Sequence, residues 1–302
     1  MNVPDVGTDV DKAAGILHDG GLVALPTETV YGLAAAIDRP DALRRIFSVK
    51  GRPIDHPLIV HVVDVNQART LCCEWPSPAE RLSSTFWPGP LTLILRRSGA
   101  VPDEVTGGRD TVAIRCPSHP MAQSLLRLVR TPLAAPSANR FGRVSPTCAQ
   151  HVVDDLDGDV DYVLDGDSSS IGVESTIVDC TVEPVQVLRP GAITADQIER
   201  VVGSAAPASG PSRASGMLES HYAPRCKIIA VESSEEGERL SAKPRHRLID
   251  TRTSPDDAAR RLYADLRRCD QEGVETAVIV LPEPLGIGLA LRDRIMKAAA
   301  GA

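Results

Sequence analysis

The chain has 302 residues, with 33 Lys+Arg against 40 Asp+Glu and a formal net charge of −7. With 42% hydrophobic and 24% charged residues it is not a disordered chain, and its acidity excludes sequence-independent nucleic-acid binding over a broad basic surface. A length near 300 residues indicates two domains, because a single hydrophobic core stops growing at roughly 250–300 residues.

The cysteines and the amino terminus indicate the cellular compartment in which the protein works. The seven cysteines are odd in number, show no C-x-x-C spacing and form no zinc-type cluster with histidine, so we expect free thiols and no metal site. The first residues, MNVPDVGTDVDK, are acidic and lack the apolar segment of a signal peptide, and no apolar run approaches the length of a membrane span. We therefore expect a cytoplasmic protein that does not contact a membrane.

The first two-thirds of the chain alternate short apolar strands with helices. A capping box at Thr8 should open a helix that stops at Gly20, and further helices are predicted at 40–49, 120–129 and 194–202. Strands are predicted at 22–25, 58–63, 91–95, 111–114, 133–135, 162–164, 176–178 and 185–188. This order predicts an α/β fold with an open, twisted, mixed sheet, in which the closely spaced later strands pair antiparallel.

The last third of the chain changes character twice. Residues 203–224 are rich in small residues and proline and show little apolar periodicity, which is typical of a linker. After them, strands at 226–231, 247–249 and 276–281 alternate with helices, which predicts a small doubly wound α/β domain. We expect a catalytic domain at 8–203, a linker at 204–225 and a small domain at 226–302, and residues 1–203 together have a net charge of −8.

Polar side chains stand at the ends of the predicted strands, where α/β sheets bind ligands. Thr27 and Thr29 follow the first strand, although they could merely cap a turn. His61 interrupts an apolar strand, where a histidine satisfied within the core is the more common occurrence. Arg115 ends another strand, and Ser137 with Asn139 follows the next, either as ligand contacts or as turn formers.

Cations recur at these same strand ends. Lys50 and Arg52 flank Gly51 between a helix and a strand, where they could hold an anion or simply favour the helix carboxyl terminus. The chain has 28 Arg and only 5 Lys, and Lys50 is one of two lysines in the first 203 residues, the other being Lys12. One rim of the sheet would then form a cationic, concave cleft for a nucleotide or polyphosphate, lined by Lys50, Arg52, Arg115, Arg140, Arg143 and Arg189.

Eight ordered blocks resemble a known family. They are PTETVYGL, K-x-R with PLIVH, WPGPLT, TVAIRCP, APSAN, SPT, GVESTIVD and VLRPG, over about residues 20–192. They are similar to the YrdC-like L-threonylcarbamoyladenylate synthases, and HYAP at 221–224 before a small α/β domain resembles the longer two-domain form of these enzymes.

The resemblance implies a nucleotidyltransferase that uses L-threonine, bicarbonate and ATP with Mg²⁺. Its product, threonylcarbamoyl-AMP, would serve tRNA modification through separate transferase proteins, with at most weak or indirect contact to tRNA. Lys50 and Arg52 would be the catalytic cations. Four residues would bind threonine, namely Thr29, His61, Arg115 and Ser175. Others would bind ATP, namely Lys50, Arg52, His56, Thr111, Ser137, Asn139, Ser145, Arg189 and Tyr222.

The chain departs from the family pattern at two places. His56 stands where an asparagine is usual, and Leu218-Glu219-Ser220 replaces a stretch rich in Lys, Tyr and Arg, which makes the linker less cationic. Two alternative functions remain. A non-catalytic RNA-binding module would need a basic face with stacking aromatics, but aromatics are only 3% of the chain. Carbamoyl-phosphate-using maturases contain a related domain, but they are much larger and carry C-x-x-C pairs.

Overall fold

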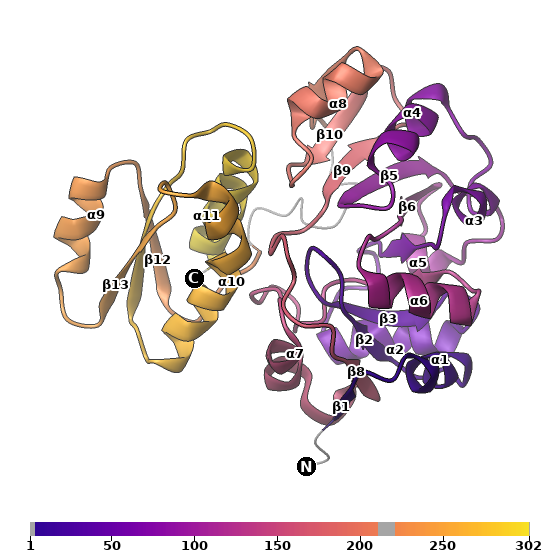
Figure 1. The fold of residues 1–302 in the computed structure, drawn as a ribbon, viewed down its shortest axis with the longest axis horizontal. Helices are drawn as coiled ribbons and strands as arrows, with labels where there is room; N and C mark the ends of the chain where they lie inside the picture. The colour runs from indigo at the N-terminus through magenta and orange to yellow at the C-terminus, as the bar shows by residue number, and fades with distance from the viewer. Residues whose placement is uncertain (1–3, 211–220, 302) are drawn as a thin grey trace.

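The computed structural model describes residues 4–210 and 221–301, and Figure 1 shows its two parts. An eleven-stranded mixed sheet and its helices form the large unit (residues 4–207), with the strand order β1-β8-β2-β3-β7-β4-β6-β5-β9-β10-β11. A three-stranded parallel sheet, ordered β12-β14-β13, and its helices form the small unit (residues 227–301). The predicted fold class, a large mixed α/β sheet followed by a small α/β unit, is confirmed.

Most strands are short and buried, as the apolar runs in the sequence indicated. In the large unit they are β1 (Asp5–Gly7), β2 (Val23–Leu25), β3 (Gly32–Ala36), β4 (Ile59–His61), β5 (Leu91–Arg96), β6 (Thr111–Arg115), β7 (Leu133–Ala134), β8 (Tyr162–Leu164), β9 (Thr176–Asp179), β10 (Val185–Arg189) and β11 (Ala205–Pro207). In the small unit they are β12 (Lys227–Val231), β13 (His246–Asp250) and β14 (Thr276–Val280).

The helices cover both sheets. Those of the large unit are α1 (Val10–His18), α2 (Pro40–Lys50), α3 (Val65–Thr70), α4 (Ser77–Phe86), α5 (Asp103–Thr106), α6 (Pro120–Val129), α7 (Ala149–Leu156) and α8 (Ala195–Val202). Those of the small unit are α9 (Ser234–Ser241), α10 (Pro255–Gln271) and α11 (Gly288–Gly301). Helix α1 is capped by Asp9, one residue after the predicted Thr8, because the Asp9 carboxylate accepts from the backbone N–H of Lys12 at 3.0 Å.

Three strands were not expected from the sequence: β1, which extends the edge of the sheet beside β8, and the strands β3 and β11. Strand β3 consists of glycine, leucine and three alanines, which have little preference for strands, yet it pairs with β2 and β7 in the middle of the sheet. Strand β11 lies inside the segment that composition indicated to be a linker, and it adds to the sheet edge beside β10. In β3 and β11 pairing with a neighbouring strand outweighs the weak local preference.

The sheet topology brings the polar strand ends to one edge. Strands β4 and β6 run parallel, with His61 opposite Arg115 at their carboxyl ends. Strand β5 runs antiparallel to β6, which sets Thr92, near its amino end, opposite Arg115. Strand β9 is parallel to β5, so Thr176 at its start lies beside Leu91. The residue before β9, Ser175, therefore joins the same edge.

The two units share a hydrophobic core. Val30, Val144 and Val173 of the large unit pack into the same buried cluster as side chains from α10, β14 and α11. Figure 1 shows α10 and α11 on the side of the small sheet that faces the large unit. Within the described residues, no helix has the length and apolar character needed to cross a membrane.

Candidate functional site

Seven of the predicted side chains line one narrow cleft at this edge of the sheet. They are Thr29, His61, Arg115, Ser137, Ser175, Arg189 and Tyr222. They come from strand ends and loops far apart in the sequence, as the strand-end pattern indicated. The cleft has a free volume of only about 40 Å³, so its walls are nearly in contact.

Arg115 forms the ionic centre of the cleft. Its side chain is 4% exposed, and its guanidinium pairs with the Glu28 carboxylate at 2.7 Å. It also donates to the Thr29 hydroxyl at 2.7 Å. Burial raises the pKa of Glu28, but the charge of Arg115 and its hydrogen bond outweigh burial, and the net shift is downward. Glu28 is thus an anion that holds Arg115 in place.

Thr27 shapes the turn that presents Thr29. The Thr27 hydroxyl donates to the Val30 carbonyl at 2.6 Å and accepts from the backbone N–H of Thr29 at 3.2 Å. This is the turn-forming role that the sequence left open, although the turn leads into strand β3 and caps no helix. The Thr29 hydroxyl lies 2.9 Å from that of Thr27, inside the cleft.

His61 lines the cleft at the end of β4 and is 4% exposed. Its Nδ1 is buried and makes no hydrogen bond within the described part of the chain, so it is not the satisfied core histidine considered above. Burial, assisted by the charge of Arg115, lowers the pKa of His61 to about 3. The ring is therefore neutral at physiological pH.

Ser175 and Arg189 are bonded to each other. Arg189 donates to both the carbonyl and the hydroxyl of Ser175 at 3.0 Å, and the Ser175 hydroxyl lies 2.7 Å from that of Thr92. All three side chains are at most 3% exposed. The antiparallel pairing of β9 and β10 fixes this arrangement, because it brings the end of β10 next to the start of β9.

Lys50, at the carboxyl end of α2, reaches the loop after β7. Its ammonium donates to the backbone carbonyls of Ser137 and Asn139. The side chain is 2% exposed, and no carboxylate pairs with it among residues 4–210 and 221–301. Burial, together with the positive charge of Arg52, lowers the pKa of Lys50 well below its usual range. A buried ammonium without a counter-ion is costly, which favours an anionic ligand here.

An aromatic chain covers the cleft above Arg52. The guanidinium of Arg52 lies 5.6 Å from the ring centre of Phe141, which contacts His221 at 6.0 Å edge to face. His221 lies 4.1 Å from Tyr222, and Tyr222 has a left-handed φ of 65°. The Tyr222 hydroxyl is buried and has no hydrogen-bond partner within the described residues. His221 and Tyr222 thus close the cleft from above.

Four predicted residues do not line the cleft. Thr111 starts β6 whereas Arg115 ends it, so the two lie roughly 13 Å apart along the strand. His56 packs edge to face on Phe141 at 5.4 Å, outside the cleft wall. Arg140 pairs with Asp159 at 2.6 Å, and Arg143 lines a different groove, beside α7 and α10. The expected rim of six cations is therefore wrong for Arg140 and Arg143. Arg115 and Arg189 line the cleft, whereas Lys50 and Arg52 reach it through the carbonyls of the lining residues Ser137 and Pro57. Residues 218–220 lie outside the described residues.

Two further predicted residues stand directly behind the cleft wall. Asn139 lies in the loop that Lys50 holds, and its side-chain oxygen is buried without a hydrogen-bond partner among the described residues. The Ser145 hydroxyl donates to the Glu174 carboxylate at 2.6 Å. Glu174 was not predicted, although an acidic residue between Val173 and Ser175, just before a strand, is unusual enough to have signalled a buried role.

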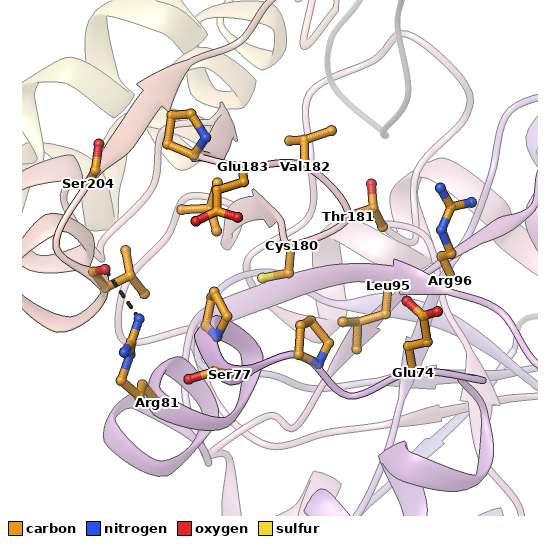
Figure 2. Close-up of a pocket in the computed structure, with 15 residues that line it drawn as sticks. Glu74, Ser77, Arg81, Leu95, Arg96, Cys180, Thr181, Val182, Glu183 and Ser204 are labelled. Atoms are coloured by element: carbon orange, nitrogen blue, oxygen red, sulfur yellow. Dashed lines mark hydrogen bonds between the residues drawn. The ribbon is translucent and has the colours of Figure 1, made fainter.

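A larger hollow lies elsewhere on the large unit, between α4, β5 and the turn after β9, and Figure 2 shows it. Its volume is about 510 Å³, and none of the predicted residues lines it. Its two arginines are engaged: Arg81 donates to the Val202 carbonyl at 3.2 Å, and Arg96 pairs with Asp110 at 2.8 Å. The smaller cleft, where the buried polar groups converge, is the candidate site.

The buried histidines predict a stability that depends on pH. Burial lowers the pKa of both His61 and His221 to about 3, whereas an unfolded chain has about 6.5. Below pH 6.5 only the unfolded state takes up these protons, so stability is complete above that pH and falls on acidification. Between pH 7.5 and 5.5 we expect a loss of about 1.4 kcal/mol per histidine, or about 3 kcal/mol together.

Urea unfolding at pH 7.5, 6.5 and 5.5 measures this loss. His221→Gln should reduce the loss by about 1.4 kcal/mol, while Gln in place of the exposed His18 serves as the control. An identical pH dependence in His221→Gln and the parent protein would contradict the assignment of a neutral, buried ring.

Comparisons with known proteins follow the same division of the chain. A family model described as "Telomere recombination" matches residues 15–191, and one described as "Threonylcarbamoyl-AMP synthase, C-terminal domain" matches residues 193–300. A threonylcarbamoyl-AMP synthase of Pyrococcus abyssi is 41% identical over 317 residues, covering 95% of this chain and 92% of that protein. One of Bacillus subtilis is 39% identical over 322 residues, covering 97% and 93%.

A solved structure extends the similarity to the whole fold. The crystal structure of P. abyssi Sua5 complexed with L-threonine matches with a TM-score of 0.93 at 38% sequence identity. The match covers 99% of this chain and 98% of that one, so both units and their relative placement are alike.

Proposed function

The chain belongs to the two-domain family of threonylcarbamoyl-AMP synthases, and from that premise we propose how its cleft makes threonylcarbamoyl-AMP from L-threonine, bicarbonate and ATP. The predictions of family, enzyme class and product are confirmed, so the protein is a nucleotidyltransferase. The roles of single residues, the use of bicarbonate and the part played by Mg²⁺ are the content of the proposal. The observation that carries it is the buried Lys50, which has no carboxylate partner among the described residues and donates to the carbonyl of Ser137, a residue of the cleft wall.

The reaction has two bond-forming steps. The threonine amine attacks bicarbonate, which gives a carbamate and releases water. A carbamate oxygen then attacks the α-phosphorus of ATP, the bond to the β-phosphate oxygen breaks, and pyrophosphate leaves. Two anions must approach each other in the second step, so positioned cations and dipoles supply much of the barrier reduction.

The threonine side of the cleft is formed around Arg115. Its guanidinium suits a carboxylate, and Glu28 and Thr29 fix its orientation. The hydroxyls of Thr29 and Ser175 and the neutral ring of His61 supply short polar contacts for the amine and hydroxyl of the amino acid. With a pKa of about 3, His61 is a weak base, so we assign it to binding and not to proton abstraction.

The nucleotide side is formed by Lys50, Arg52 and Arg189, with Ser137, Asn139 and Ser145 from the adjoining loops. Lys50 would give up part of its hydrogen bonding to the two carbonyls and bind the phosphates instead. The negative phosphates would favour the positively charged form of Lys50, which burial disfavours. Within the described residues no cluster of three His, Cys, Asp or Glu could hold a metal. We assign Mg²⁺ to the ATP itself, where phosphate oxygens and water would coordinate it.

Substrates must displace the cover before they bind. The free volume of about 40 Å³ has room for no more than a few water molecules, which is far less than a nucleotide needs. His221 and Tyr222 come from the segment that precedes the small unit, and His221 contacts Phe141 of the large unit edge to face at 6.0 Å. We assign to Tyr222 the closing of the cleft over the bound nucleotide.

The product would pass to separate transferase proteins that modify tRNA. The large unit is acidic, which disfavours a strong contact of its own with the tRNA backbone. The cations of the cleft are buried in strand ends and loops, so they serve a small anion and not an extended nucleic acid.

Pyrophosphate release, assayed with ATP, L-threonine or bicarbonate omitted in turn, tests the proposal. We expect release to need all three, and to fall to the background of a protein-free reaction when any one is absent. Full release without threonine would refute the assignment, because ATP would then be split by another route. Chelation of Mg²⁺ should abolish release, and added Mg²⁺ should restore it.

A further inference from the structure

One carboxylate in the cleft wall is held mainly from the small unit. Glu174 is 6% exposed and lies between Val173 and Ser175 in the loop before β9. Among the described residues three side chains bond it, and one of these, Ser145, comes from the large unit. The other two are Tyr263 on α10 and Arg294 on α11, and each lies more than eighty residues away in the chain.

Arg294 is the most deeply buried cation of the small unit. Its side chain is 0% exposed, and its Nε lies 2.8 Å from the Glu174 carboxylate. A second nitrogen donates to the carbonyl of Pro190 at 3.0 Å, next to Arg189. The Tyr222 ring lies 5.3 Å from the same guanidinium. Arg294 therefore contacts two loops of the cleft and its cover at once.

Tyr263 supports the same carboxylate from the neighbouring helix. Its hydroxyl donates to Glu174 at 2.8 Å, and its ring stacks on Tyr222 at 5.7 Å. The side chain is 0% exposed, so this hydrogen bond is shielded from water. Tyr263 and Arg294 share one oxygen of Glu174, while Ser145 takes the other.

The backbone of this loop is pressed against α10. Gly172 has a left-handed φ of 82°, and a side chain there would meet the carbonyl of Ala259 at 2.4 Å. The next residue, Val173, is buried in the shared core. The small unit thus fixes the path of the loop as well as its carboxylate.

The charge balance explains why this support matters for the nucleotide. Burial alone would raise the pKa of Glu174, but the charges of Arg294 and Arg189 and the hydrogen bond from Ser145 lower it to about 2. Glu174 is therefore an anion beside residues assigned to phosphate. Without Arg294 its charge would face the phosphates uncompensated and repel them, and Ser145 would lose its fixed acceptor.

We propose that Arg294 and Tyr263 are positioning residues, through which the small unit sets the affinity of the cleft for ATP. They act through Glu174 on Ser145 and Arg189, and they do not touch the reacting atoms. The inference rests on the proposed function, since it assigns Ser145 and Arg189 to ATP. Threonine, which is assigned to the Arg115 side, should be affected much less.

Steady-state kinetics of pyrophosphate release by Arg294→Met test the proposal in the full chain. We expect the KM for ATP to rise about 10- to 100-fold, as for a lost charge-assisted hydrogen bond, while the KM for threonine changes less than about 3-fold. Arg294→Lys should recover part of the ATP affinity. Arg292→Met is the matched control, because Arg292 lies on the same helix and pairs with Glu232 inside the small unit.

Two further variants separate positioning from folding. If Arg294→Met is unstable, Arg294→Met with Glu174→Gln removes the uncompensated charge and should recover the melting temperature and part of the ATP affinity. Tyr263→Phe removes one hydroxyl and should raise the KM for ATP about 3- to 10-fold. Unchanged KM values in folded Arg294→Met and Tyr263→Phe, or equal rises for both substrates, would overturn the proposal. Failure of the parent protein to need ATP would refute the proposed function instead.

Discussion

Replacing Lys50 with alanine should slow pyrophosphate release by roughly 100- to 1,000-fold, the effect of losing one preorganised donor at a charge-developing centre. Lys50 is 2% exposed and has no carboxylate partner within the described residues, so its charge is available to phosphate oxygens. Its bonds to the carbonyls of Ser137 and Asn139 also hold the adjoining loop. Single-turnover release of pyrophosphate at saturating substrates measures the loss.

Lys12→Ala is the matched control, since it removes the other lysine of the first 203 residues, which is exposed and pairs with Asp5. Lys50→Met keeps most of the side-chain length without the charge. If it slows pyrophosphate release as much as Lys50→Ala does, the effect is due to the charge. Arg52→Ala should show a loss of similar size, since Arg52 donates to the carbonyl of Pro57 in the cleft wall and is likewise assigned to the phosphates. Near-normal release in Lys50→Ala and Arg52→Ala would contradict the cationic clamp.

Arg115→Ala should destabilise the protein by about 3–5 kcal/mol at pH 7, because it leaves the buried Glu28 carboxylate without its partner. The pKa of Glu28 is lowered by Arg115 against the opposing effect of burial, so in the variant it should rise. The stability deficit should shrink as the pH falls toward the new pKa and Glu28 becomes neutral. Urea unfolding between pH 7 and pH 4 measures both effects.

A second substitution separates stability from threonine binding. Arg115→Ala with Glu28→Gln removes the unpaired charge, so it should regain most of the lost stability while threonine binding, measured by calorimetry, stays undetectable. Recovery of threonine binding in the double variant would exclude Arg115 as the group that holds the amino-acid carboxylate.

The strand ends were the informative part of the sequence. A polar residue directly after an apolar run can be placed at the edge of an α/β sheet without knowledge of the strand order, and this argument brought Thr29, His61, Arg115 and Ser137 to one cleft. Thr111 was assigned to ATP through the family resemblance, and it starts the strand that Arg115 ends, so it lies away from the cleft. The strand-end argument failed for Arg140, whose partners Asp159 and Val49 are set by tertiary packing.

The contacts of Glu174 could not be predicted from local patterns. Arg294 lies in a helix where an apolar residue would suit its buried position equally well, so periodicity gives no sign of its partner 120 residues earlier. Strand β3 was missed for a related reason, since its alanines prefer no strand and only pairing on both sides specifies one. Both the Glu174–Arg294 contact and strand β3 are specified by the packing of segments that lie far apart in the sequence, which local sequence patterns do not reveal.

Because the two units share a hydrophobic core, the small unit cannot be replaced by another domain without disturbing the packing of the large unit. Val30, Val144 and Val173 are inherited with the large unit but are buried against α10 and α11, so they must fit side chains encoded more than eighty residues downstream. A different domain of the same size, joined through the same linker, would leave these valines and the Glu174 carboxylate unmatched. The two halves of the gene are therefore expected to accumulate substitutions in concert.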